Sequence, residues 1–485
     1  MNNTRITLLG SQNEVLKEWL TGDPDGHERG AIILFRKLSR PVKDLPKSIR
    51  FLAVEIIKMT DDWIIESSAN HILINMRMFP DVYCKCEQEN LELGFVHSHP
   101  DGELEFSNKD DINEQNILHG LSGSNGVNSC LISLILSNDK WTGRVSDGKA
   151  IGSFSPIRHI LIISDKIEIH GIREILELPA SLKRQEAAFG KPFNLQLQSL
   201  RIAVVGLGGT GSPLATMLAR SGIGELILID GDHVDDTNLN RVRGYTADDI
   251  NKNKAISLKR FIDKLGLNTL TAAIPNYLYD SPEAIDALSS SDVIFGCTDD
   301  VIGRDILNQS LYYYAQPLID VGLTGFVDND KDGVPYLRDH RGRVSCILPE
   351  SGACLRCQGV VTDKKIEFEQ AIRDNPELAK LDPETLKREY YLIGGGEQAP
   401  GVGPFTSMTA DNGVATLMNL IRKFRDIPTD LREDNIWIDF IHLTIHSNLP
   451  KDDSECIYCK LHDVLLKKEK YRLDMPQLGK IPDYE

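Results

Sequence analysis

The chain has 485 residues, a formal net charge of −17 and a pI near 5.2. This length exceeds one ordinary hydrophobic core, so two or three domains are expected, and the acidic balance argues against nucleic acid or an anionic membrane as the main partner. No apolar run approaches the length of a membrane span and the N-terminus has no signal-like apolar core, so we expect a cytoplasmic protein without a membrane segment.

An α/β domain is predicted over residues 1–176, and its centre is the stretch 93–111. A short strand there leads into His97 and His99. Residues two apart on a strand face the same side, so both imidazoles can bind one metal ion. Asp110, at the start of a predicted helix, can return as a third ligand. Two imidazoles, one carboxylate and a water make an open tetrahedral zinc site of the catalytic kind.

A water on such a metal needs a general base, and Glu28 is the candidate because it heads an apolar run, 28–35, that would form an adjacent buried strand. Glu55 and Glu66 also precede the histidines and remain alternatives. Zinc lowers the pKa of its water towards about 7, and Glu28 would take the proton and pass it to the leaving amine. Ser107 can donate a hydrogen bond to the resulting oxyanion.

The order Glu, His-x-His-Pro and Ser-x-x-Asp resembles the JAB/MPN (JAMM) metalloproteases, which remove ubiquitin or related modifiers. The resemblance covers most of residues 1–176. It implies zinc-dependent hydrolysis of an (iso)peptide bond after the C-terminal glycine of a ubiquitin-like protein. The alternatives are two surface histidines with an unrelated acid, and a domain that binds zinc without activity.

A strand, glycine-rich turn, helix and second strand are predicted from Arg201 to Asp230. Glycines let backbone N–H groups approach a phosphate at a positive helix N-terminus without an intervening Cβ, and Asp230 would lie beside a ribose hydroxyl. The glycines of this turn are Gly206, Gly208, Gly209 and Gly211. The motif alone leaves NAD and ATP open, and a tight turn that binds nothing is the structural alternative.

Residues further along the chain favour ATP. An acid, an amide and two cations follow in the pattern D-x-D…N-L-x-R…K, and a Cys-Thr-Asp sequence closes the next strand; these residues are Asp232, Asn238, Arg241, Lys254 and Asp299, with Arg304 one turn later. An enzyme that holds a triphosphate, coordinates magnesium and expels pyrophosphate needs such groups. An NAD site does not.

Residues 182–459 resemble the ubiquitin-activating superfamily, whose simplest members are the ThiF/MoeB-like adenylyltransferases. The resemblance implies a Rossmann-like adenylation domain over residues 200–460, in which Asp230 binds the ribose, Arg241 and Lys254 bind phosphates and Asp299 holds magnesium. The family usually has Gln after the Arg, and this chain has Val242.

The linker 177–199 is helical in composition and carries Arg184. In the activating family, an Arg-Gln on a helix before the first strand reaches the ATP γ-phosphate of the other subunit. Arg184 is therefore a candidate contact in trans, and a homodimer is implied. The alternative is a solvated charge on a linker helix.

Two C-x-x-C pairs about a hundred residues apart supply four thiolates, which suit a closed structural zinc site in the adenylation domain; they are Cys354, Cys357, Cys456 and Cys459. Reduced surface thiols are the alternative. No cysteine lies between residues 358 and 455, where thioester-forming relatives carry their nucleophile, and Cys346, on the strand before the first pair, is expected to be buried. A helical insertion is predicted over 364–391, and the tail 461–485 is expected to be a short helix followed by a loose end.

These expectations combine into an enzyme with two active sites that uses zinc, ATP and magnesium and acts on a partner protein ending in glycine. In the favoured interpretation it cleaves and adenylates a ubiquitin-like protein of a bacterial-type modifier pathway and passes it to a conjugating enzyme. The alternative is a sulfur-carrier protein that is processed, adenylated and passed to a sulfurtransferase to become a thiocarboxylate. An NAD-dependent redox protein with an accessory metal domain and a non-catalytic docking scaffold are alternatives from other classes.

Overall fold

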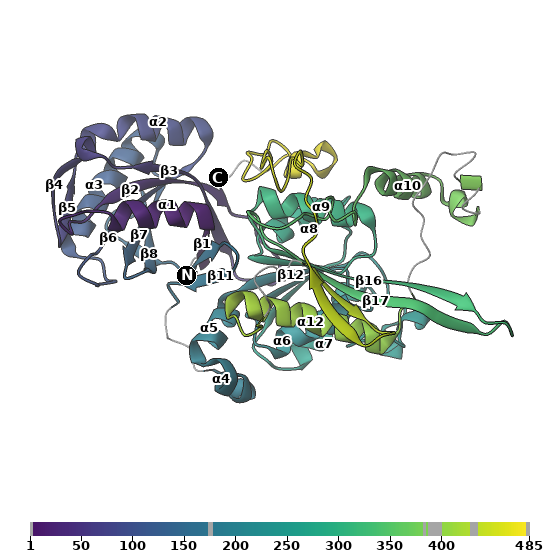
Figure 1. The fold of residues 1–485 in the computed structure, drawn as a ribbon. Coiled ribbons are helices and arrows are strands. Elements are labelled where there is room, and N and C mark those ends of the chain that lie inside the picture. Colours follow the sequence, from purple (N-terminus) through teal and green to yellow (C-terminus); the bar gives the residue numbers. More distant parts are fainter. Residues whose placement is uncertain (1–2, 173–177, 382–384, 387–399, 427–434, 482–485) are drawn as a thin grey trace. The chain divides into compact units, whose positions relative to one another are not determined.

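A computed structural model describes residues 3–172, 178–381, 385–386, 400–426 and 435–481. The chain forms two compact units, residues 1–41 with 46–176 and residues 42–45 with 177–485, and each unit is built around its own sheet (Figure 1). None of the helices in the described part of the chain has the length and hydropathy of a membrane span.

The first unit contains a nine-stranded mixed sheet in the order β11-β10-β1-β3-β2-β6-β7-β8-β9, and a separate hairpin of β4 and β5. Its strands are β1 (Asn3–Leu9), β2 (Gly30–Leu38), β3 (Ser48–Lys58), β4 (Ile64–Ser68), β5 (His71–Ile74), β6 (Glu92–Ser98), β7 (Cys130–Ser137), β8 (Lys140–Asp147), β9 (Phe154–Pro156), β10 (His159–Ile163) and β11 (Ile167–His170). Its helices are α1 (Gly10–Thr21), α2 (Pro80–Glu89) and α3 (Asn108–Asn125).

Strand β2 is buried on both faces of this sheet. Alternate side chains point to opposite faces: Ile33 belongs to the apolar cluster that includes α1, and Ile32 to the cluster that includes α2 and α3. This explains why residues 30–35 of the stretch 28–35, which we predicted to be a buried strand, are apolar without interruption. The prediction is confirmed, and β2 pairs with β6 so that Gly30 lies opposite His97.

The second unit contains an eight-stranded sheet in the order β14-β13-β12-β15-β16-β17-β18-β19. Its strands are β12 (Arg201–Val205), β13 (Glu225–Ile229), β14 (Leu270–Ile274), β15 (Val293–Gly296), β16 (Leu318–Asn329), β17 (Pro335–Ile347), β18 (Asn435–Asp439) and β19 (Thr444–Asn448). Its helices are α4 (Lys183–Phe189), α5 (Lys191–Ser199), α6 (Gly211–Arg220), α7 (Lys254–Lys264), α8 (Pro282–Ser289), α9 (Val301–Tyr313), α10 (Asp363–Asp374) and α12 (Gly403–Ile421).

The first five strands of this order run parallel and the last three continue antiparallel. Helices α8 and α9 cover one face of the sheet, and α6, α7 and α12 lie on the other (Figure 1). The chain leaves β12 towards β13 and β14 and then returns to place β15 on the other side of β12. Ligands of such sheets bind at this reversal, beyond the carboxyl ends of the strands.

Several predicted boundaries differ from the observed ones for local reasons. Helix α3 begins two residues before Asp110 because Ser107 caps it, accepting a hydrogen bond from the Asp110 N–H. The linker forms two short helices, α4 and α5, because Gly190 between them adopts a φ of +85°. Of the predicted insertion 364–391, the structure shows α10 and a 3-10 turn over Pro376–Lys380, and residues 382–384 and 387–391 lie outside the described part.

The tail is not a loose end over its described residues, and it contains 3-10 turns rather than an α-helix there. Arg472 donates two hydrogen bonds, of 2.7 and 2.6 Å, to the carboxylate of Asp286 in α8, and Leu473 and Leu478 are buried. A bidentate arginine pair and buried leucines fix the segment to the unit, and charge composition alone does not show such partners.

Candidate functional site

A cavity of about 720 Å³ opens at the carboxyl ends of the parallel strands of the second unit. Most residues predicted for nucleotide binding line this one cavity: Gly206, Gly208, Gly209, Asp230, Asp232, Asn238, Arg241, Lys254 and Asp299. Gly211 begins α6 directly behind it and is buried. The structure therefore brings together groups from separate parts of the sequence at the topological reversal of the sheet.

The glycines of the turn after β12 have two different functions. Gly206 has a φ of +83°, and a Cβ there would lie 2.7 Å from the Cys297 carbonyl oxygen, while a Cβ on Gly211 would lie 1.8 Å from the carbonyl oxygen of Gly206. Close backbone packing therefore requires both. A Cβ on Gly208 would meet nothing within 4 Å, so packing does not require this glycine, and its open side is where a phosphate could approach the backbone.

Asp230 fastens the glycine turn to the end of β13. Its Oδ2 accepts from the Leu207 N–H at 2.6 Å and its Oδ1 from the Asp232 N–H at 2.8 Å, and burial raises its pKa. Each carboxylate oxygen has a further lone pair. Asp230 can therefore hold the turn and also accept a hydrogen bond from a ribose hydroxyl.

The cations of the cavity are held by neighbouring oxygen atoms. Lys254 Nζ lies 2.9 Å from Asp232 Oδ2, and Arg241 donates from Nη1 to the Thr237 carbonyl oxygen at 2.6 Å. Arg304 lies 3.3 Å from the buried carboxylate of Asp320. Asp299 is exposed in the cavity, where a carboxylate oxygen suits a magnesium ion.

Sequence reasoning missed one wall of the cavity. Tyr277 and Tyr279 line it from the segment after β14, and Arg373 lines it from α10. The two tyrosines follow a strand end of the parallel sheet, and that position was the signal that could have identified them. Nothing in the local sequence around Arg373 indicates that its helix packs against the start of α9.

The four cysteines of the two pairs lie together, with their sulfur atoms within 4.8 Å of one another. Zinc–sulfur bonds of about 2.3 Å in a tetrahedron place the sulfur atoms about 3.8 Å apart. The Sγ atoms of Cys354 and Cys456 are 3.7 Å apart, and those of Cys357 and Cys459 are 3.6 Å apart. The donor set and spacing therefore fit a structural zinc ion.

A second cluster lies in the first unit, where Glu28, His97, His99 and Asp110 also converge within 4.8 Å and are all buried. The Nε2 atoms of the two histidines are 3.0 Å apart, and Asp110 places its oxygens 3.1 Å from His97 Nε2 and 3.6 Å from His99 Nε2. Zinc bonds of about 2.0 to 2.2 Å give ligand separations of about 3.3 to 3.6 Å. Two imidazoles and one carboxylate fit such an ion and leave a fourth position open.

Glu28 lies beside this position rather than within it, with Oε1 4.0 Å from His99 Nε2. Burial raises the pKa of Glu28 to about 8, which suits a group that takes and returns a proton near neutral pH. Glu55 instead forms an ion pair with Lys85, and Glu66 with His71, so the geometry favours Glu28 among the three acids.

Two further residues with predicted functions are Ser107, which caps α3, and Arg184, which lies on α4. The Ser107 hydroxyl accepts from the Asp110 N–H at 3.2 Å, which leaves its own proton available for donation. Arg184 lies exposed on α4, and its predicted contact in trans stays a prediction.

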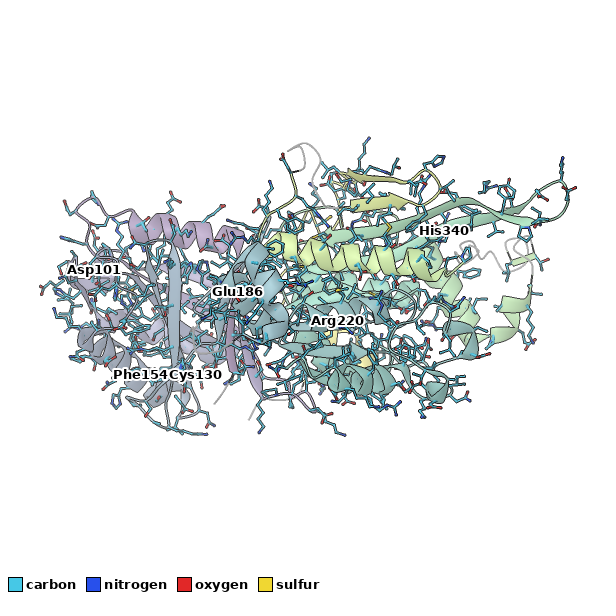
Figure 2. The ribbon with its side chains drawn as sticks, turned by 90° about the horizontal axis from the view of Figure 1, so that it is seen from below. Asp101, Cys130, Phe154, Glu186, Arg220 and His340 are labelled. Carbon is cyan, nitrogen blue, oxygen red and sulfur yellow. The ribbon has the colours of Figure 1, made fainter. Side chains whose placement is uncertain are left out.

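Four of the five remaining cysteines are buried, and Cys84 is exposed. Cys130, labelled in Figure 2, begins β7 and is buried, as are Cys86, Cys297 and Cys346. The expected burial of Cys346 is confirmed. Cys297 lines the nucleotide cavity, but burial raises the pKa of its thiol, which suppresses the thiolate form that would act as a nucleophile.

The profile of the ThiF family matches residues 182–456. The chain is 36% identical over 131 residues to the adenylyltransferase and sulfurtransferase uba4 of Aspergillus terreus, which is 27% of each chain. It is 33% identical over 132 residues to the sulfur carrier protein ThiS adenylyltransferase of Escherichia coli, covering 27% of this chain and 52% of that one. It is 30% identical over 163 residues to the SAMP-activating enzyme E1 of Haloferax volcanii, covering 33% and 54%.

The chain thus spans between about a quarter and about half of the length of these relatives. Among solved structures, it is similar to E. coli MccB with a TM-score of 0.43 and 22% identity, over 58% of this chain and 72% of that one.

Proposed function

Because this chain belongs to the ThiF family, we propose that its second unit is an ATP-dependent adenylyltransferase that activates the C-terminal carboxylate of a sulfur-carrier or ubiquitin-like protein. The observation that carries the proposal is the single cavity in which the glycine turn, two cations and an exposed acid meet. Two of the similar proteins are named as adenylyltransferases, which supports the same reaction here.

The chemistry assigns a role to each group. A carboxylate oxygen of the partner attacks the α-phosphorus of ATP, a new oxygen–phosphorus bond forms, and the bond to the bridging oxygen breaks as pyrophosphate leaves. Arg241 and Lys254 stabilise the charge that develops on the phosphates. Asp299 would hold magnesium, which when bound neutralises phosphate charge. The backbone around Gly208 orients the phosphates at the N-terminus of α6.

We favour a sulfur-transfer outcome over a modifier pathway. Among the described residues, Cys297 is the one cysteine in the cavity, and its buried thiol is a poor nucleophile. A sulfide-level nucleophile supplied by another molecule would then attack the acyl carbon, a carbon–sulfur bond would form as AMP leaves, and the C-terminus would become a thiocarboxylate, in line with relatives named as sulfurtransferases as well. A conjugating enzyme as acceptor, and a homodimer that brings in Arg184 of a second chain, remain further proposals.

The antiparallel strands β16 to β19, at one side of the sheet of the second unit, carry exposed side chains that suit a protein partner. Large apolar side chains are exposed along β16 to β19: Phe326 (45% exposed), Tyr336 (48%), Leu443 (89%) and Ile445 (56%). Phe326, Tyr336 and Ile445 lie on strands and Leu443 on the turn before β19, and exposed apolar groups of this kind suit contact with a protein partner.

A second function is favoured by the cluster of Glu28, His97, His99 and Asp110 in the first unit. We propose that it hydrolyses a peptide or isopeptide bond, as the resemblance to the JAMM metalloproteases implies. The two histidines and Asp110 would hold zinc, which when bound activates a water molecule, and Glu28 would carry the proton to the leaving amine. Cleavage after a terminal glycine would expose the carboxylate that the second unit activates.

One experiment tests adenylation directly. The purified chain is incubated with ATP, magnesium, labelled pyrophosphate and a sulfur-carrier protein ending in glycine, and label exchange into ATP is measured. Exchange that requires the carrier and is lost in Arg241→Ala supports the proposal. Failure to exchange, together with binding of NAD rather than ATP in calorimetry, would favour the redox alternative.

A further inference from the structure

Helix α10, which follows the first cysteine pair, brings a side chain to the nucleotide cavity. Arg373, in its last turn, lines the cavity together with Tyr279. The guanidinium carbon of Arg373 lies 3.7 Å from the centre of the Tyr279 ring, and Tyr279 stacks on Tyr277 with ring centres 5.1 Å apart and planes inclined by 15°. The three side chains form one continuous stack at the cavity wall.

Neighbouring groups hold this stack in place. Glu369, one turn earlier in α10, pairs with Arg373 and accepts from the backbone N–H groups of Val301 and Ile302 at the start of α9. Tyr277 donates its hydroxyl proton to Asp232. The wall is therefore organised without a ligand, and a group that stacks on it meets little ordering cost.

The charge around Arg373 indicates what kind of group it would contact. Its guanidinium is paired with Glu369 and lies 3.5 Å from Asp300 Oδ1, so its positive charge is already matched by two carboxylates. A phosphate would be repelled by those acids. A flat, uncharged ring meets no such penalty and stacks well on a planar guanidinium.

The position of Arg373 points to the same group. Tyr279 follows β14 and Asp300 follows β15, so Arg373 bridges segments that flank the ends of β13 and β12. With Asp230 as the ribose contact and the glycine turn as the phosphate contact, we propose that Arg373 stacks on the base of the bound nucleotide, backed by Tyr279. This inference rests on the proposed adenylyl transfer.

The test uses titration calorimetry of the full chain with ATP and with AMP, each with magnesium. Arg373→Ala should weaken both nucleotides by the same factor, about fivefold to thirtyfold, because both carry the base. Arg373→Lys should also weaken both nucleotides by a common factor, since an ammonium group has no plane to stack. Lys364→Ala, an exposed position on the same helix, is the matched control and should bind both nucleotides like the wild type.

Three outcomes would overturn the inference. Unchanged binding by Arg373→Ala would place the residue outside the site. Weakening of ATP alone, with recovery in Arg373→Lys, would show a phosphate contact. A marked fall in the unfolding temperature of Arg373→Lys without nucleotide would show a structural role. If the wild type bound neither ATP nor AMP, the proposed adenylyl transfer would fail with it, and this result is distinct from the other three.

Discussion

The substitution Gly208→Ala tests whether the glycine turn after β12 binds a ligand separately from its function in backbone packing. A Cβ at Gly208 would meet no atom within 4 Å, and its φ lies outside the left-handed region. The folded state therefore tolerates alanine, and the lower entropy of the unfolded chain stabilises the variant by up to about 1 kcal/mol. Gly206→Ala should instead destabilise strongly, because its Cβ would lie 2.6 Å from the Thr298 nitrogen and its φ is +83°.

The same methyl group should obstruct the nucleotide. If it costs one hydrogen bond between a backbone N–H and a charged phosphate, about 1.5 to 3 kcal/mol is lost. Since about 1.4 kcal/mol corresponds to a factor of ten, the Kd for ATP should rise about tenfold to 150-fold.

Thermal unfolding and titration calorimetry measure the two effects separately. Gly123→Ala is the matched control: its Cβ also meets nothing within 4 Å, but it lies on α3 in the first unit, so ATP binding should not change. A Gly208→Ala chain that unfolds like the wild type and binds ATP with unchanged Kd would refute the proposed approach of phosphate to this backbone.

Metal analysis should find about two zinc ions per chain, and Cys354→Ser should lose one of them and lower the unfolding temperature, because a closed thiolate site contributes to folding; retention of both ions would remove the structural site. His97→Ala should lose the other ion and any peptide cleavage while pyrophosphate exchange continues, and loss of exchange as well would contradict separate active sites. Asp299→Ala should abolish exchange and leave cleavage intact, so residual exchange near the wild-type rate would exclude it as the magnesium ligand. Incubation with ATP and a carrier protein should give AMP-linked carrier without a reductant-sensitive adduct on the chain, whereas an adduct that disappears in Cys346→Ala would make Cys346 a nucleophile.

Much of the nucleotide cavity could be predicted because its parts follow strand ends of a parallel sheet. Asp230 directly follows β13 and Asp299 lies three positions beyond the end of β15, and the sheet order brings such strand ends together. Local sequence patterns therefore predicted both the strands and the edge of the sheet at which their carboxyl ends lie together. The same holds for the two histidines, because His97 lies on β6 and His99 directly follows its last residue, so their spacing of two still places them on a common face.

The missed features depend on contacts between distant segments. Arg373 reaches the cavity because Glu369 binds the start of α9, about seventy positions earlier in the sequence, and no local pattern encodes that contact. The tail was expected to be loose for the same reason. Its charged composition resembles a disordered end, but Arg472 finds the carboxylate of Asp286 in α8, and such pairing appears only in the folded chain.

Helix α9 explains why a cysteine cluster belongs in a nucleotide-binding unit. At its start, Asp300 caps the helix, and Gly303 and Arg304 line the cavity. The next residue, Asp305, accepts two hydrogen bonds, of 2.8 and 2.9 Å, from Arg356, which lies between Cys354 and Cys357. One short helix therefore touches the cavity and the cysteine segment, and we predict that a metal ion held by the thiolates would fix the position of the side chains that line the cavity.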